Sequence, residues 1–132
     1  LLVMSTVGTQ LTKDADFGVI YVLAYLNGKE IDAIKSTVFS TTPPSGQTGD
    51  FYYHVDKVAK KVILKKHNGT GWIDATGEDL PKGTYKYFRR NSEGVELDKA
   101  GIPWNTGKAV FVDRTIIDGS TAFMCEADIP LA

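Results

Sequence analysis

The segment DGSTAFMCEADI, from Asp118 to Ile129, constrains the fold more strongly than any other part of the chain. After an Asp-Gly turn, its residues divide by alternation into an apolar face and a more polar one. The apolar face holds Phe123, Cys125, Ala127 and Ile129, and the other face holds Ala122, Met124, Glu126 and Asp128. Successive side chains of a strand point to opposite faces, so this pattern is typical of a strand with one buried face. We therefore expect a half-buried strand here, with Cys125 as a buried structural thiol.

Further segments show the patterns of strands. Residues 85–90 alternate with the same period, and Val110 and Val112 indicate another strand. The nearly continuous apolar run from Phe17 to Leu26 is typical of a central strand, covered on both faces or packed on a neighbouring module. Shorter strands are expected within 1–16, at 29–32, at 34–39 and at 95–97. No segment sustains a helical apolar period, so the chain is predicted to be all-β.

The middle of the chain is predicted to form a smaller inserted unit. Paired prolines followed by serine and glycine make 41–48, TTPPSGQT, a linker that fits neither a sheet nor a helix. Two strands follow, then an Asn68-Gly69 turn, and Trp72 caps the apolar side. The phrases GDFYY at 49–53 and VILKKHNGTGW at 62–72 resemble a short β-meander of phage tail fibres. The expected boundaries are 41–74 for the inserted linker and meander, and 1–40 with 75–132 for a surrounding β-sandwich.

Three phrases outside this insert resemble strands of immunoglobulin-like domains. They are KYFRR at 86–90, TGKAVFVD at 106–113 and DGSTAFMCEA at 118–127, which match strands C, E and F. The resemblance puts Tyr87 in the place of a buried tryptophan and Phe123 in the tyrosine-corner place. Phe123 has no hydroxyl for the corner hydrogen bond, and the chain has no second cysteine for a disulfide. The phrasing is most similar to modules of phage and prophage tail proteins, which implies an antiparallel immunoglobulin-like β-sandwich.

The resemblance implies a non-enzymatic structural role in a phage or prophage tail or tail fibre. Such a module would assemble with other virion subunits, contact the host surface and be located in the virion. It would belong to a longer, oligomeric protein. A sequence that starts at Leu1 and stops at Ala132 is expected to be a piece of such a protein. The alternative is a carbohydrate-binding or adhesin module that recognises an anionic glycan at a bacterial cell surface.

The predicted meander differs from the rest of the chain in charge. Between Asp50 and Trp72 there are five lysines and two aspartates, whereas the chain from Asn91 onward holds seven acidic and three basic residues. The lysines suit solvated strand edges, contact with an anionic polymer, or docking to an acidic virion neighbour. The aromatic rings suit either packing or stacking on sugars. The candidate binding residues are Tyr52, Lys61, Lys65, His67, Trp72 and Trp104, the last in the 100–107 loop.

Composition and motifs exclude several other functions. The formal net charge of −1 argues against nucleic acid as a partner, because phosphate binding needs a basic surplus. No apolar run reaches the ~18 residues of a membrane span. With one cysteine, and with His54 and His67 lacking a third ligand, no metal or other cofactor is expected. Glu78 and Asp79 are adjacent acids in a loop and are expected to cap or be solvated rather than to catalyse.

Overall fold

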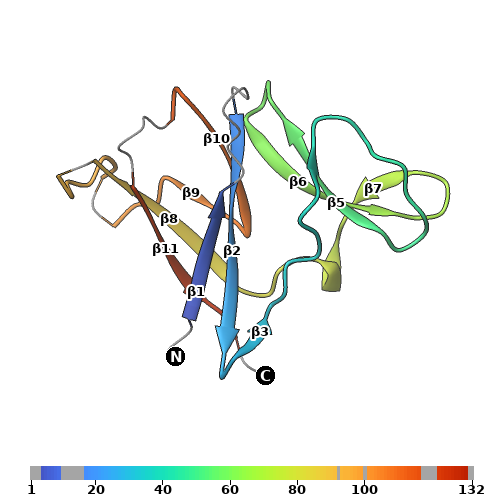
Figure 1. The fold of residues 1–132 in the computed structure, drawn as a ribbon, viewed down its shortest axis with the longest axis horizontal. Coiled ribbons are helices and arrows are strands. Elements are labelled where there is room, and N and C mark those ends of the chain that lie inside the picture. Colours follow the sequence, from blue (N-terminus) through green and yellow to red (C-terminus); the bar gives the residue numbers. More distant parts are fainter. Residues whose placement is uncertain (1–3, 10–16, 92, 100, 117–121, 131–132) are drawn as a thin grey trace.

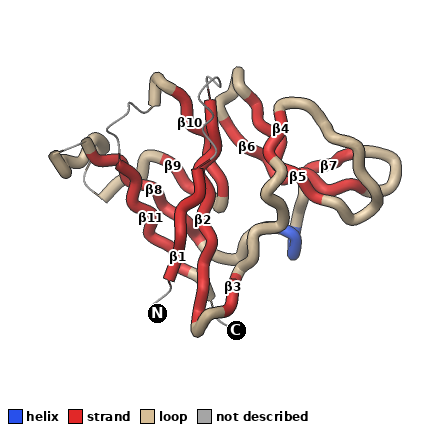
Figure 2. Tube along the Cα trace, in the orientation of Figure 1, coloured by secondary structure: helices blue, strands red, loops and turns tan. Residues whose placement is uncertain are grey.

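The computed structural model of the chain describes residues 4–9, 17–91, 93–99, 101–116 and 122–130. The helical structure in these ranges is a short 3₁₀ turn, η1 (Gly77–Asp79), and no helix there is long and apolar enough to cross a membrane. The strands are β1 (Met4–Thr9), β2 (Phe17–Leu26), β3 (Lys29–Ile31), β4 (Phe39–Ser40), β5 (Phe51–Asp56), β6 (Lys61–His67), β7 (Trp72–Asp74), β8 (Thr84–Arg90), β9 (Asn105–Thr106), β10 (Ala109–Asp113) and β11 (Ala122–Asp128). The prediction of an all-β chain is confirmed (Figure 2).

The strands form three sheets (Figure 1). Sheet A has the antiparallel order β1-β2-β10, and β3 also pairs with β2 across the Asn27-Gly28 turn. Sheet C has the order β11-β8-β9, and sheet B has the order β4-β5-β6-β7. Sheets A and C draw their strands from both sides of residues 39–74, and sheet B is made of that middle part alone. In Figure 1, sheet B lies beside the other two sheets along the long axis of the molecule.

Sheets A and C enclose one hydrophobic core between them. Its buried members are Ile20, Val22, Ala24, Val110 and Val112 from sheet A, Tyr85 and Tyr87 from sheet C, and Ile129 just after β11. Tyr87, expected in the place of a buried tryptophan, is fully buried. The predicted alternation of β11 is confirmed, because Phe123, half-buried Cys125 and Ala127 pack against this core while Met124 is exposed. The predicted Asp118-Gly119 turn lies outside the described residues.

The opposite face of sheet A is covered by sheet B. Val19 of β2 packs with Val55 of β5 in a second buried cluster. Beside it the rings of Tyr21, Phe39 and Tyr53 stack in sequence, with centroid distances of 5.4 and 5.3 Å. Strand β2 therefore has both faces covered, which accounts for its nearly continuous apolar run. Of the explanations that the sequence allows for this run, a cover from within the same chain is the correct one.

Sheet B is an antiparallel meander, β5-β6-β7, with β4 added to β5 in the parallel direction. The predicted Asn68-Gly69 turn joins β6 to β7. The Asn68 side-chain oxygen accepts hydrogen bonds from the backbone N–H groups of Thr70 and Gly71, each at 2.9 Å. Gly69 adopts a φ of 101°, a left-handed conformation that side chains rarely permit.

The strand expected at 34–39 is wrong, because only Phe39 of that range enters a ladder, as part of β4. Asp32, with a φ of 48°, turns the chain away from β2 at the end of β3. Ile34 then packs against the hydrophobic cluster of sheet B. The apolar residues of this range are therefore used as single anchors in a loop that connects two sheets.

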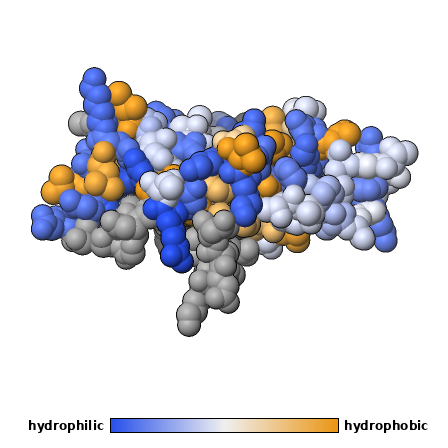
Figure 3. Space-filling model, turned by 90° about the horizontal axis from the view of Figure 1, so that it is seen from above, coloured by the Kyte–Doolittle hydropathy of each residue, from blue (hydrophilic) through white to orange (hydrophobic). Residues whose placement is uncertain are grey.

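The strand expected at 95–97 is also wrong, since Glu96 makes only an isolated bridge to Arg90. Asn91 holds this segment in a compact turn: its side-chain oxygen accepts the N–H of Val95 at 3.0 Å. Val95 is 56% exposed, and Figure 3 shows apolar atoms at this end of the molecule. Turn contacts outweighed the β-propensity of Val95 here.

Candidate functional site

Five of the six predicted binding residues lie on the outer face of sheet B, away from sheet A. Side chains two apart along a strand share a face, so Lys61, Lys65 and His67 of β6 lie together. Cross-strand pairing places Tyr52 opposite Lys65, and Trp72 opposite His67. The outer face of sheet B is thus a mixed aromatic and basic surface.

The aromatic side chains of this face are packed against one another. Tyr52 is only 1% exposed, and the Trp72 ring meets it edge-on at a centroid distance of 4.7 Å. Trp72 also contacts the ring of His67 at 5.0 Å and donates its indole N–H to the Pro44 carbonyl at 2.9 Å. An added Cβ at Gly46 would lie 2.5 Å from the Trp72 ring. Trp72 is therefore fixed between the 41–48 linker and Tyr52.

The lysines of the meander are largely engaged in ion pairs. Lys65 pairs with Asp74 on the neighbouring strand β7. On the inner face Lys66 pairs with Asp79 at 3.0 Å, and Lys60 reaches Asp113 of sheet A at 3.0 Å. Lys61 is exposed on the outer face. The local positive charge counted from the sequence is therefore partly neutralised by acids from other segments.

Trp104, the sixth predicted residue, lies directly before β9 of sheet C and not in the meander. Its ring packs against Phe123 at a centroid distance of 5.4 Å, and the Arg89 guanidinium lies 5.3 Å from the ring centre. Its backbone N–H bonds to the Tyr87 carbonyl at 2.8 Å. Arg89 in turn pairs with Asp98 at 2.7 Å. Trp104 thus closes one end of the A–C core.

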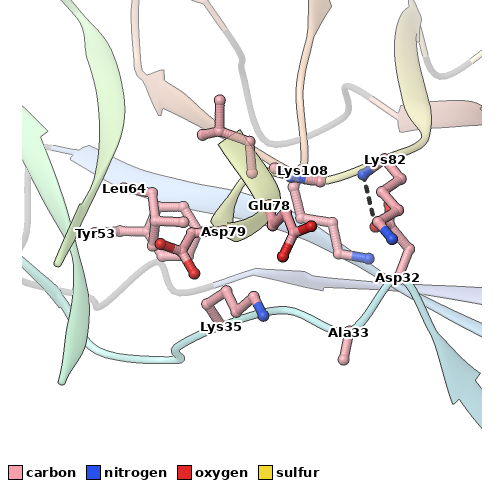
Figure 4. Close-up of a pocket in the computed structure, with 11 residues that line it drawn as sticks. Asp32, Ala33, Lys35, Tyr53, Leu64, Glu78, Asp79, Lys82 and Lys108 are labelled. Atoms are coloured by element: carbon pink, nitrogen blue, oxygen red, sulfur yellow. Dashed lines mark hydrogen bonds between the residues drawn. The ribbon is translucent and has the colours of Figure 1, made fainter. Parts of the chain in front are cut away.

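A cavity of about 310 Å³ lies where sheet B meets the sandwich of sheets A and C (Figure 4). Apolar residues and charged residues of both signs line it. The charged lining residues are Asp32, Lys35, Glu78, Asp79, Lys82 and Lys108, and the remainder are Ala33, Tyr53, Leu64, Leu80 and Pro81. The cavity is thus built from the loop after β3, strands β5 and β6, the η1 segment with the residues that follow it, and the residue just before β10.

Lys108 is the one charged side chain found buried in the described part of the chain, at 4% exposure. Its ammonium donates to the Tyr85 hydroxyl at 3.1 Å and lies 4.6 Å from the centre of the Tyr85 ring. The Tyr85 hydroxyl donates to the Asp32 carboxylate. Asp32 also accepts the backbone N–H groups of Lys82 at 2.7 Å and Gly83 at 2.9 Å. This polar network connects three segments that are distant in the sequence.

Burial and hydrogen bonding shift the pKa values of this network. Burial lowers the pKa of Lys108, although the Asp32 carboxylate opposes that shift. Burial and the hydrogen bond to Asp32 raise the pKa of Tyr85. Burial by itself raises the pKa of Asp32, but hydrogen bonds from Tyr85 and from two backbone N–H groups outweigh it and leave that pKa below its usual range. At neutral pH the network therefore holds a carboxylate and a neutral phenol beside the lysine.

The sequence contained a signal for this network that was missed. Lys108 has the same parity as Val110 and Val112, so strand alternation puts it on the core-facing side of the chain. A charged residue at such a position predicts a buried polar partner. Asp32 could not have been named as that partner, because its approach depends on the path of the chain between sheets A and B.

The other reactive groups serve packing or lie apart from the cavity. Burial raises the pKa of the Cys125 thiol to about 11, which disfavours the nucleophilic thiolate at neutral pH. In the described ranges, no group of three or more histidine, cysteine or acidic side chains is arranged to hold a metal ion. The cavity around Lys108 is suited to bind a polar molecule by hydrogen bonds and charge.

No family model, curated protein or solved structure matches the chain.

Proposed function

We propose that this chain is a non-enzymatic structural module of a larger assembly, of the kind found in phage or prophage tails and tail fibres. The observation that carries the proposal is the packing of sheet B on sheet A, because it fixes the meander as a rigid extension of the sandwich. The ring stack from Tyr21 through Phe39 to Tyr53 and the Lys60–Asp113 ion pair cross this contact. A rigid, elongated module suits a spacer or a decoration on a tail.

The strand pairing supports an immunoglobulin-like assignment for sheets A and C. In the constant-type fold, strands A, B and E share one sheet and strands C and F share the other. Here β1, β2 and β10 pair in that manner, and β11 pairs with β8. The phrases that resemble strands C, E and F fall on β8, β10 and β11 respectively. Under this assignment, the meander is inserted between strands B and C.

The contacts of Asp32 and Asp79 support a non-enzymatic role. Asp32 is occupied by three hydrogen bonds, and Asp79 is paired with Lys66. Both carboxylates are thus engaged in contacts within the chain. We therefore assign these groups to holding the three sheets together.

Immunogold labelling of phage particles from the source organism tests this proposal. Antibodies raised against the chain should decorate tails or tail fibres in electron micrographs. Pre-absorbing the antibodies with the purified chain is the control and should abolish the label. Labelling confined to soluble fractions, with none on particles, would contradict a role in the virion.

The alternative function is recognition of an anionic bacterial surface glycan by the outer face of sheet B. The cross-strand register that gathers Tyr52, Lys65 and Trp72 on one face favours it. A glycan array or whole-cell binding assay should then give a signal that Trp72→Ala and Lys61→Ala reduce. Lys29→Ala, an exposed residue in β3, is the matched control. If the chain has only the structural role, the original chain gives no binding signal in this assay.

A further inference from the structure

The cavity beside Lys108 continues into a second one of about 350 Å³. The two share five lining residues: Tyr53, Leu64, Leu80, Pro81 and Lys108. The first is lined by most of the charged groups, and the second by aliphatic and aromatic side chains with Gly83, Thr106 and Gly107. Small-molecule pockets measure roughly 300–1,000 Å³, so each compartment alone suits a small molecule.

The buried ammonium of Lys108 has more donors than its protein partners use. An ammonium carries three N–H donors, and Lys108 bonds one hydrogen-bond acceptor among the described residues, the Tyr85 hydroxyl. A buried charge is costly unless it is paired. Asp32 accepts hydrogen bonds from Tyr85, Lys82 and Gly83, and the Lys108 ammonium reaches it only through the Tyr85 hydroxyl. An anionic group in the cavity would satisfy the ammonium and offset the cost of burying it.

The other charged groups of the cavity define what else such a molecule would carry. Lys35 and Glu78 line the same cavity as Lys108 (Figure 4). Lys35 adds a second cation for an anionic group. Glu78 makes no ion pair or hydrogen bond through its side chain in the described part of the chain, and its carboxylate can accept only from donors such as hydroxyl groups. Tyr53 and Leu64 provide an apolar wall for a ring.

We propose that this cavity binds a small hydroxylated organic anion, a monosaccharide-sized sugar acid or sugar phosphate, whose anionic group lies between Lys108 and Lys35. Hydroxyl groups of the ligand donate to Glu78, and its ring rests against Tyr53 and Leu64. This site is separate from the outer face of sheet B and does not depend on the proposed structural role. Under this proposal, the module binds a small ligand at the place where its sheets meet.

Isothermal titration calorimetry with D-glucuronate, glucose 6-phosphate and D-glucose tests the proposal. At least one of the two anions should bind about tenfold or more tightly than glucose, since a charge-assisted hydrogen bond distinguishes them. Binding of glucuronate alone identifies a sugar acid, and binding of glucose 6-phosphate alone identifies a sugar phosphate. Equal binding of all three sugars, or binding of neither anion, would overturn the proposal.

Variants locate the binding to this cavity. Lys108→Met keeps the length of the side chain and should weaken anion binding about tenfold or more. Lys35→Met changes an exposed residue, so this variant should fold even if Lys108→Met does not. It should also bind the anion more weakly than the original chain does. Lys29→Met changes an exposed residue that does not line the cavity, and this variant should bind as the original chain does. Unchanged binding in Lys35→Met, together with amide NMR shifts on the outer face of sheet B rather than at Leu64, would reject the site.

Discussion

The two faces of β2 show how different contacts can hold one strand. Toward sheet C, the side chains of Ile20 and Val22 enter a core of fully buried aliphatic and tyrosine side chains. Toward sheet B, the contact is made by a smaller buried cluster and by stacked rings, and beside β2 an ion pair joins Lys60 to Asp113 of β10. The first interface follows from strand alternation, and the second depends on how a loop brings distant segments together. We expect the A–C core to determine whether the chain folds and the A–B contact to determine where the meander is held.

Tyr87→Ala should give the largest effect, because it empties the centre of the A–C core. Tyr87 is completely buried, and removing a large buried aromatic side chain costs roughly 3–5 kcal/mol. Urea denaturation followed by tryptophan fluorescence measures the loss. Met124→Ala, on the exposed side of β11, is the control and should change stability by much less. A small loss for Tyr87→Ala would mean that the A–C core is not the main source of stability.

Val55→Ala should weaken the A–B contact and leave the A–C core folded. Removing two methyl groups from this buried site should cost about 1–3 kcal/mol. Hydrogen exchange should show faster exchange in β5 and β6, with β8 and β11 still protected. Val58→Ala, in the fully exposed β5–β6 turn, is the matched control. Equal loss of protection in all three sheets would show that the two interfaces unfold as one unit.

Asp32→Asn tests the polar network at the edge of the A–B contact. The Asp32 carboxylate accepts hydrogen bonds from two backbone N–H groups and from the Tyr85 hydroxyl, and the substitution removes its charge. The loss should lower the free energy of unfolding by about 1–3 kcal/mol at neutral pH. Because the pKa of Asp32 is lowered in the folded state, its contribution is present above the unfolded pKa of about 4 and is lost as pH falls through the folded pKa.

The difference in unfolding free energy between Asp32→Asn and the original chain should therefore shrink in acid. Denaturation curves from neutral pH to about pH 3 measure it. Asp128→Asn, exposed at the end of β11, is the control and should show little difference at either pH. A deficit that stays constant with pH would show that the Asp32 charge does not stabilise the fold.

Lys60→Met should have the smallest effect. Lys60 pairs with Asp113 across the A–B contact, but its side chain is 44% exposed, and exposed ion pairs contribute at most about 1 kcal/mol. High salt should reduce the difference further by screening the pair. Thermal unfolding at low and high ionic strength measures it. A loss as large as that of Val55→Ala would mean that the contact is electrostatic rather than apolar.

Local patterns predicted the parts of the fold that depend on neighbouring residues. The alternation of Phe123, Cys125 and Ala127 identified β11, the apolar run identified β2, and Asn68-Gly69 identified a hairpin of the meander. The parallel pairing of β4 with β5 has no such local signal, because it depends on the path of the chain after Asp32.

The candidate site was harder to predict for the same reason. Cross-strand register on adjacent strands gathered Lys65, His67 and Trp72, but the sequence could not show that Tyr52 is buried beneath Trp72. Trp104 lies beside sheet C rather than sheet B, since its backbone N–H bonds to the Tyr87 carbonyl. The Lys108 cavity combines residues from segments far apart in the chain, so only the three-dimensional arrangement reveals it.

The cover that sheet B gives to sheet A limits how the chain can be shortened. A deletion of 41–74 would remove β5 and β6 and leave Val19 and Phe111 facing water. An apolar strip of that kind on a sheet promotes self-association, so the truncated protein should precipitate or form multimers. The inserted segment therefore keeps the module soluble by covering this face of sheet A. An engineered version that lacks the segment needs another cover for that face, and a short linker does not provide one.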